Sequence, residues 1–295
     1  MIRVTAFTAF ALAAFALNSV LCRLALRDGE ADAAGFTGLR LLAGAVALAA
    51  IFYCRGPRMS RGATRNLDVM PLRALRHSGS WISAFFLFAY AACFSFAYLG
   101  LTTASGALIL FGTVQTTMIA IGIIKGERPS LLEWLGFIIA FGGLVYLVIP
   151  GLASPPLINA LLMAAAGMAW AAYTLRGKGS DDPLADTTGN FIRSVPMAVL
   201  IVVLYFPNLH LSGRGIVLAI ISGAVTSGIG YTVWYAVLKD HSWTRVAVLQ
   251  LSVPVIAAAG GAVFLAEAFT TRLVIAGAVI LGGIGMTIIG RRPVT

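Results

Sequence analysis

Long apolar stretches of about twenty residues each alternate with short polar connections along most of this chain. Such a stretch is long enough to cross the hydrocarbon core of a bilayer as a helix. The pattern predicts ten membrane-spanning helices in an all-α fold, at residues 4–26, 34–54, 79–100, 104–125, 131–149, 156–175, 187–206, 214–238, 244–265 and 272–290. The first stretch is longer than the 7–15 apolar residues of a signal peptide, so we expect an uncleaved first helix.

The stretch Ala247–Gly290 repeats the pattern of Ala107–Tyr146, in which two apolar runs flank a turn that contains a glutamate. A shift of 140 positions superposes the copies, and the matching pairs are Ala107 with Ala247, Glu127 with Glu267, and Gly142-Gly143 with Gly282-Gly283. The repeat predicts two five-helix halves, residues 1–150 and 151–295. Because five is odd, the halves enter the membrane from opposite sides, which is the inverted repeat of many secondary transporters.

The composition agrees with a membrane protein, because 59% of the residues are hydrophobic and only 11% are charged, whereas soluble chains have about a quarter charged residues. The net charge of +10 could indicate a nucleic-acid partner, but the basic residues lie between the apolar runs. With a cytoplasmic N-terminus, 15 of the 21 lysines and arginines fall in cytoplasmic segments and three in outer loops. This asymmetry predicts a multi-pass protein of the bacterial inner membrane with both termini in the cytoplasm and no nucleic-acid partner.

Motifs of soluble enzymes and of cofactor sites are missing from the sequence. Gly177-Lys178-Gly179 lacks the upstream glycine of a phosphate-binding loop, and Gly283 and Gly285 lie in an apolar helix where close packing explains them. The three histidines do not cluster, and the three cysteines lack metal or disulfide spacing. We therefore expect neither an enzyme nor a bound cofactor or metal.

Taken together, the ten spans, the inverted repeat, Arg40 and Arg193 early in the second helix of each half, and a fourth helix that ends in glutamate resemble the drug/metabolite transporter superfamily. The second half is similar to EamA-type exporters through Tyr235–Lys239, Pro254, Leu265-Ala266-Glu267 and the glycine-rich last helix. The first half departs from the pattern at Val114, where the repeat would place a proline. The resemblance is strongest to bacterial exporters of aromatic and other amino acids, and it implies alternating access around a central cavity.

Polar and aromatic residues at mid-membrane depth are the candidate substrate site. They are Asn18, Ser19, Tyr90, Phe94, Tyr98, Gln115, Trp170, Tyr173, Tyr231, Trp234, Gln250 and Ser252. Tyr and Trp near helix ends are typical of interfacial belts, but a deep amide needs partners in the bundle or in a wet cavity. We expect a cavity of about 300–1,000 Å³. Its walls should be Trp170, Tyr90, Phe94 and Tyr98, with Asn18 and Gln115 as hydrogen-bond partners of the substrate.

Charged residues narrow the substrate class. None of the eleven acidic residues lies in the middle of a predicted span, whereas an exporter of cationic drugs would be expected to have a carboxylate there. Asn18 stands at the depth where the small multidrug transporters of the resembled superfamily have glutamate. Binding should therefore be apolar, aromatic and hydrogen-bonded. Arg23 and Arg40 could attract a carboxylate, but we favour snorkelling or pairing with Asp28, Glu30 or Asp32.

Proline and glycine mark candidate moving parts. Pro254 should kink the ninth helix near its middle, either as a fixed bend or as a gating hinge together with Gly260 and Gly261. The small-residue pairs Gly136/Ala140 and Ala278/Gly282 favour close helix packing, either within the chain or in a homodimer. A monomer and a homodimer both remain possible.

The sequence thus favours a secondary exporter of amino acids, aromatic and other neutral ones, with broad specificity. Export of drugs, nucleobases or sugar-type metabolites is the alternative in the same class. A membrane receptor or an assembly factor is the alternative in a different class.

Overall fold

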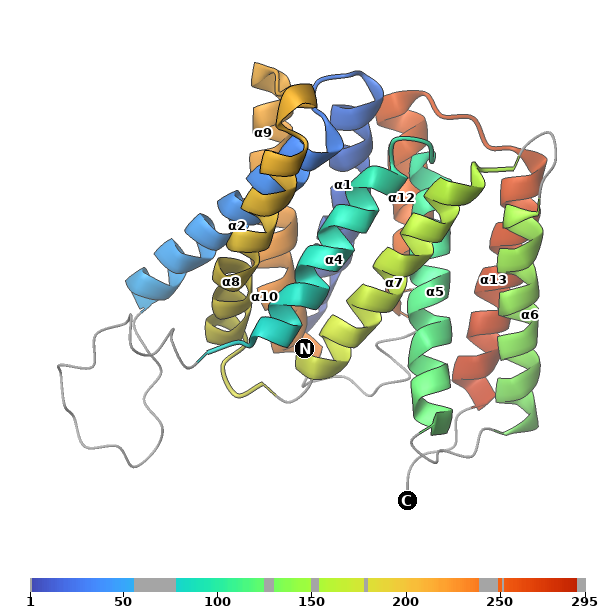
Figure 1. Ribbon diagram of the computed structural model, residues 1–295. Coiled ribbons are helices and arrows are strands. Elements are labelled where there is room, and N and C mark those ends of the chain that lie inside the picture. Colours follow the sequence, from blue (N-terminus) through green and yellow to red (C-terminus); the bar gives the residue numbers. More distant parts are fainter. Residues whose placement is uncertain are drawn as a thin grey trace, which may run out of the picture.

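The computed structural model describes residues 2–55, 78–124, 130–149, 154–177, 180–238, 249–250 and 252–290. Figure 1 shows their helices standing side by side in one bundle, with the start of α1 and the end of α13 toward the same end. Their bounds are α1 Ile2–Arg27, α2 Ala33–Arg55, α4 Trp81–Ala97, α5 Thr103–Ile124, α6 Leu131–Val148, α7 Leu157–Gly177, α8 Pro183–Leu204, η1 Phe206–Asn208, α9 Gly213–Ile221, η2 Ser222–Ile229, α10 Gly230–Leu238, α12 Ser252–Leu265 and α13 Thr271–Gly290.

These helices confirm the predicted ten-helix membrane fold, with the eighth span built from α9, η2 and α10. Within the described residues, six helices are long and apolar enough to cross a membrane, and four shorter apolar helices accompany them. The eighth span is not uniform, because η2 is a π-helix that replaces the middle of the expected α-helix. Such π segments are rare and often occur at functional sites.

The two halves run in opposite directions, as helices α6 and α13 show. Ser130, before α6, donates a hydrogen bond to the carbonyl of Gly290 at the end of α13 (2.9 Å). Arg272, at the start of α13, donates to the carbonyl of Tyr146 near the end of α6 (2.6 Å). The start of each helix therefore lies against the end of the other, as an inverted repeat requires.

Equivalent helices of the halves make equivalent contacts. Helix α4 packs on α7, and the eighth span packs on α1 in the same way. Helix α5 packs on α7, as α12 packs on α1. The pairs α2/α8, α5/α12 and α6/α13 join each helix to its own counterpart. The repeat boundary at residues 150 and 151 stays a prediction.

Glycines bring α6 and α13 into close contact. A Cβ atom on Gly136 would stand 2.4 Å from the carbonyl oxygen of Gly283, and one on Gly283 would stand 2.5 Å from the backbone nitrogen of Ala140. A Cβ on Gly282 would meet nothing within 4 Å. Within the chain, α13 therefore does not pack through Ala278 and Gly282, and a homodimer contact at this pair stays a prediction. The packing face passes through Gly283, and the repeat matches it with Gly143, whose Cβ would stand 2.8 Å from Ile280.

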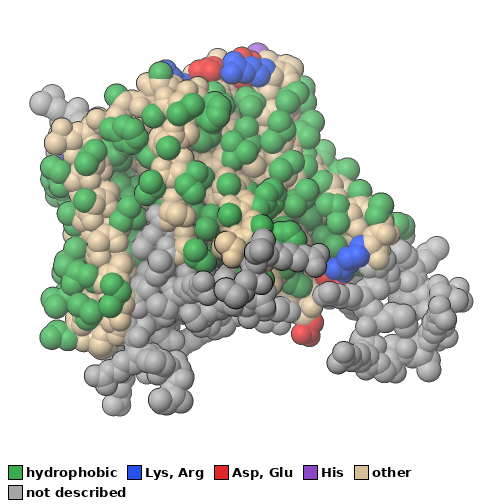
Figure 2. Space-filling model, turned by 180° about the vertical axis from the view of Figure 1, so that it is seen from behind, with side chains coloured by type: hydrophobic (Ala, Val, Ile, Leu, Met, Phe, Trp, Pro, Cys, Tyr) green, Lys and Arg blue, Asp and Glu red, His purple; other side chains and the backbone are tan. Residues whose placement is uncertain are grey.

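The surface divides into an apolar wall and two charged ends. Figure 2 shows hydrophobic side chains along the sides of the bundle and charged side chains gathered toward its ends. Large exposed side chains of the wall include Val46, Ile138, Val203 and Val263. We name the ends after one acidic residue each. At the Glu267 end, α1, α4 and α12 end and α5 begins, and at the Asp182 end, α2 ends and α8 begins.

Candidate functional site

Four aromatic side chains from four different helices meet at the centre of the bundle. They are Phe15 of α1, Tyr90 of α4, Trp170 of α7 and Tyr231 of α10. The ring centroid of Trp170 lies 4.6 Å from that of Tyr231 and 5.0 Å from that of Tyr90. These distances are those of favourable aromatic pairs. The cluster therefore joins both halves of the chain at one point.

The four rings, together with Leu110 and Phe111 of α5, line a small hollow. The space inside it that a water-sized sphere can occupy is about 10 Å³, which is room for about one water molecule. Ligand pockets in proteins have roughly 300–1,000 Å³, so the cavity expected at these residues is closed in this arrangement. The side chains of the walls have closed on one another, and a substrate would have to part them.

Polar groups behind this hollow form hydrogen bonds to the phenol oxygen of Tyr90. It accepts hydrogen bonds from Asn18 Nδ2, from Arg40 Nη2 and from the hydroxyl of Tyr231, each at 3.3 Å. Arg40 Nη2 also donates to the Tyr231 hydroxyl (3.0 Å). One polar network thus includes two of the hollow's aromatic walls.

Asn18 is buried in this network and uses both atoms of its amide. Its oxygen accepts hydrogen bonds from the hydroxyls of Ser222 (2.6 Å) and Thr226 (3.1 Å), while its nitrogen reaches Tyr90. Both hydroxyls belong to η2. Asn18 therefore lies behind the wall and ties α1 to η2 and α4.

The π-helix η2 also approaches α2 closely, because of Gly223. A Cβ atom on Gly223 would stand 2.0 Å from the carbonyl oxygen of Arg40, so only glycine fits there. Ser227, which also belongs to η2, accepts a hydrogen bond from Arg40 Nε (3.1 Å). Polar side chains of one short segment thus reach both α1 and α2, an arrangement that hydropathy alone does not indicate.

Arg40 is a buried cation, which corrects the prediction that it snorkels or pairs with a nearby acid. Arg40 is only 1% exposed. Its guanidinium carbon lies 5.1 Å from the ring centroid of Phe94. Of the three predicted partners, Asp32 accepts from the backbone nitrogens of Gly35 and His210 instead. The other two, Asp28 and Glu30, lie within 3.9 and 3.5 Å of Arg214.

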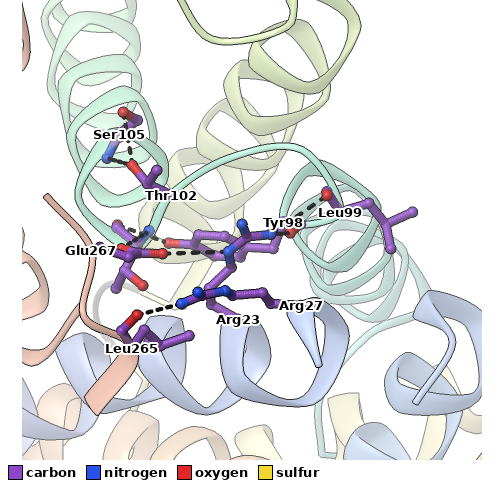
Figure 3. A network of polar contacts seen from close by, with 9 residues as sticks. Arg23, Arg27, Tyr98, Leu99, Thr102, Ser105, Leu265 and Glu267 are labelled. Carbon is purple, nitrogen blue, oxygen red and sulfur yellow. Dashed lines mark hydrogen bonds and ion pairs between the residues drawn. The ribbon is translucent and has the colours of Figure 1, made fainter. Parts of the chain in front are cut away.

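The pairing predicted for Arg23 is also wrong, since its partner is Glu267. Arg23 Nε lies 3.4 Å from Glu267 Oε1, and its Nη1 donates to the carbonyl of Tyr98 (2.7 Å). The second oxygen of Glu267 accepts from the backbone nitrogen of Thr103 (2.8 Å). Figure 3 shows this network, in which Arg27 also bonds the carbonyl of Leu265. Helices α1, α4, α5 and α12 are thereby fastened together at the Glu267 end.

The remaining predicted aromatic residues pack around the hollow. Trp234 is fully buried, with its ring centroid 5.4 Å from that of Phe15. Phe94 lies between Tyr90 and Tyr98, at centroid distances of 5.4 and 4.8 Å. Tyr98 caps α4 near the Glu267 end, and its hydroxyl donates to the carbonyl of Thr103 (3.4 Å). These three side chains support the walls and do not themselves line the hollow.

The two predicted glutamines form a contact of their own. Gln115 Nε2 donates to Gln250 Oε1 (3.2 Å), and both side chains are buried. Gln115 lies about one turn of α5 beyond Leu110 and Phe111, away from the Glu267 end. The pair therefore joins the fourth and ninth spans below the hollow, and the role of Gln115 as a hydrogen-bond partner of the substrate stays a prediction.

The candidate hinge residues are tightly packed. Pro254 stands near the first described residue of α12, and residues 249–250 before it are also helical. Most residues that would extend the helix before it, 239–248 and 251, lie outside the described residues, so the predicted mid-helix kink stays a prediction. A Cβ on Gly260 would stand 2.7 Å from Val20, and one on Gly261 would stand 2.6 Å from Glu267.

Sequence reasoning missed the apolar walls Phe15, Leu110 and Phe111, which resemble any other membrane-buried residues. It also set aside Arg40, although an arginine within an apolar stretch was the available signal. Of the predicted residues, Tyr90, Trp170 and Tyr231 line the hollow.

Comparisons with known proteins agree with this architecture. A protein of Pseudomonas aeruginosa, described as uncharacterized, is 45% identical over 289 residues, which are 98% of this chain and 96% of that protein. An uncharacterized transporter of Archaeoglobus fulgidus is 30% identical over 178 residues, 57% of this chain and 61% of its own. A crystal structure with 20% identity matches 98% of this chain and 99% of its own, with a TM-score of 0.64, and so shares the fold.

Residues 157–289, which are most of the second half, match the EamA-like transporter family. A transporter has no chemical reaction to catalyse, and this agrees with a central site built from packing and hydrogen-bonding groups. It also removes the receptor and assembly-factor alternatives. The inverted ten-helix fold, the central site shared by its halves and the match to the family lead to one conclusion: the chain is a multi-pass membrane transporter that belongs to the EamA-like transporter family.

Proposed function

We propose that this transporter exports amino acids, aromatic and other neutral ones, across the bacterial inner membrane. The observation that carries the proposal is the ring cluster of Tyr90, Trp170 and Tyr231 around the central hollow. Each aromatic pair with a flat apolar side chain would contribute about 0.5–1.5 kcal/mol beyond burial. Rings of this kind accept many apolar side chains, so specificity should be broad.

The proposed export direction rests on the resemblance to EamA-type exporters, and the proposed orientation assigns an end of the bundle to each step. The arginine-rich connection at residues 55–80 belongs to the Asp182 end, which we therefore place in the cytoplasm. The Glu267 end then faces outward. A substrate would enter from the Asp182 end and leave past the network of Arg23 and Glu267.

Alternating access requires contacts that open and close. The network at the Glu267 end is built from few residues, and breaking the contact between Arg23 and Glu267 would free α1 from the turn that follows α12. That turn is strained at Ala266, a residue other than glycine with φ of 50°. We propose that this end is the outer gate, and that the present arrangement has it closed.

The test is transport by the purified protein in liposomes. Liposomes preloaded with labelled phenylalanine, leucine or alanine should release them faster than protein-free liposomes, and phenylalanine should leave fastest because of its ring. A parallel set loaded with a nucleobase and a sugar tests the alternative substrates. If liposomes that hold folded, monodisperse protein release none of the amino acids, the proposal is overturned.

A further inference from the structure

Arg40 is a positive charge without a negative partner in the described part of the chain. Its nitrogens Nε and Nη2 donate only to neutral hydroxyls, those of Ser227, Tyr90 and Tyr231. The third nitrogen, Nη1, is buried and has no hydrogen-bond partner among the residues that the structure describes. The ion pairs of the described residues all involve other arginines.

Such a group is unusual inside a membrane protein. An arginine remains protonated in proteins, so it cannot become neutral on burial. A buried charge is costly unless it is paired, and charges within the membrane mark substrate or ion pathways. The unpartnered Nη1 therefore has a free donor for one anionic acceptor, which the described part of the chain does not supply.

The hydrogen bonds of Arg40 place its guanidinium group beside the walls of the hollow. Two of its three hydroxyl partners, Tyr90 and Tyr231, are walls of the hollow. Its guanidinium carbon also lies 5.3 Å from the centre of the Tyr90 ring. An anion that parts these two tyrosines would replace neutral hydroxyls by a charge-assisted, two-pronged contact, which is the stronger kind for arginine.

We infer that Arg40 binds the carboxylate of the transported substrate, with the substrate's apolar or aromatic body against Trp170 and Phe15. The inference rests on the proposed function and deepens it, because it adds a requirement for a carboxylate to the apolar, aromatic and hydrogen-bonded binding expected from the sequence. It also explains why a central cation is present in a site otherwise made of rings and hydroxyls.

The other half of the chain provides an internal comparison. Arg193 was matched with Arg40 by the sequence repeat, but its Nη1 donates to two backbone carbonyls, those of Ser78 (2.6 Å) and Gly189 (3.0 Å). Arg193 is thus held by the chain itself. The same residue type in the matching helix therefore serves as a control for Arg40.

The first experiment uses the unaltered protein and competition for labelled phenylalanine in proteoliposomes. The competitors are unlabelled phenylalanine, phenylalaninamide, phenethylamine and 3-phenylpropanoate. The two carboxylates should compete, and the amide and the amine should need about tenfold higher concentration or more, as expected when a charge-assisted bond is lost. Equal competition by the amide overturns the inference while the proposed function stands.

The second experiment measures binding, so that it does not depend on transport. 3-Phenylpropanoate should raise the unfolding temperature of the detergent-solubilised protein, and 3-phenylpropanamide should not. If no amino acid is transported but the acid alone stabilises the protein, the proposed function fails and the carboxylate site remains. If neither compound or both compounds stabilise it equally, the carboxylate site is refuted.

Variants then locate the effect. Arg40→Gln should remove the preference for acid over amide, Arg40→Lys should keep part of it, and Arg193→Gln should keep all of it even if stability falls. If Arg40→Gln does not fold, the comparison of Arg40→Lys with wild type decides. An unchanged acid preference in a folded Arg40 variant overturns the assignment.

Discussion

Arg23 of α1 lies 3.4 Å from Glu267, in the turn after α12, and so connects the first helix of one half to the fourth helix of the other. The side chains of both residues are mostly buried, at 15% and 9% exposure. The turn places Glu267 there through Ala266, and the Glu267 nitrogen bonds back to the carbonyl of Gly261 (3.2 Å). This contact, the bond of Thr103 to Glu267 and the bond of Arg27 to Leu265 all join the two halves at the Glu267 end.

Glu267→Gln should therefore destabilise this closed arrangement. It removes the charge opposite Arg23 and weakens the bond to Thr103, for which a loss of about 1.5–3 kcal/mol is expected from hydrogen bonds to charged groups. Thermal unfolding in detergent measures the loss. Arg214→Gln is the matched control, since Arg214 is 58% exposed and surface pairs contribute only about 0–1 kcal/mol. Equal, small shifts in the two variants would refute the role of Glu267.

Gly223→Ala should disturb the contact between η2 and α2. The added Cβ would stand 2.0 Å from the Arg40 carbonyl oxygen, a backbone atom that cannot rotate away. Overpacking of this kind costs about 1–3 kcal/mol or more. Gly282→Ala is the control, because its Cβ would meet nothing within 4 Å and helix propensity favours alanine by about 1 kcal/mol. Thermal unfolding that ranks the two variants in the opposite order would contradict the packing described for η2.

Much of the fold was predictable, because membrane helices can be recognised in a sequence by their length and apolarity. The repeat gave the inverted halves as well, since an odd number of spans fixes the direction of the second half. The aromatic residues Tyr90, Trp170 and Tyr231 could be selected because their depth in the spans is readable from the sequence. That three predicted residues line one hollow shows how far depth alone can lead.

The polar partners could not be predicted, because they depend on which helix faces meet. Arg23 and Glu267 are 244 positions apart, and Arg40 and Ser227 are 187 apart. The sequence neighbours of Arg23 and Arg40 suggested Asp28, Glu30 and Asp32, but these acids are used by the loops at the Glu267 end. The π-helix η2 was equally hidden, because it changes the facing of Ser222, Thr226 and Ser227 without changing their hydropathy.

The orientation in the membrane can be tested with a native residue. Cys54 is exposed near the Asp182 end of α2, which we place in the cytoplasm. A membrane-impermeant maleimide should label it in inverted vesicles and not in intact spheroplasts, and Cys54→Ser should abolish the signal. His210→Cys in that Cys54→Ser background, at the Glu267 end, should show the opposite pattern. Labelling of both positions from one side would be incompatible with the proposed topology.

Trp170→Ala should reduce transport of aromatic substrates more than that of small neutral ones. The Trp170 ring contacts the rings of Phe15, Tyr90 and Tyr231 in the walls of the hollow, and a substrate ring that replaces one such contact would gain about 0.5–1.5 kcal/mol. Its loss corresponds to a decrease of about two- to tenfold in phenylalanine transport relative to alanine transport. The ratio of the two initial rates in proteoliposomes is the quantity to measure, because a general loss of active protein leaves it unchanged. Trp134→Ala supplies the control. Trp134 is exposed on the apolar wall of α6, and its ring contacts Phe137 and not the ring cluster. A phenylalanine-to-alanine ratio that stays at the wild-type value in Trp170→Ala would mean that substrates pass without touching this ring, and the central hollow would no longer be the transport site.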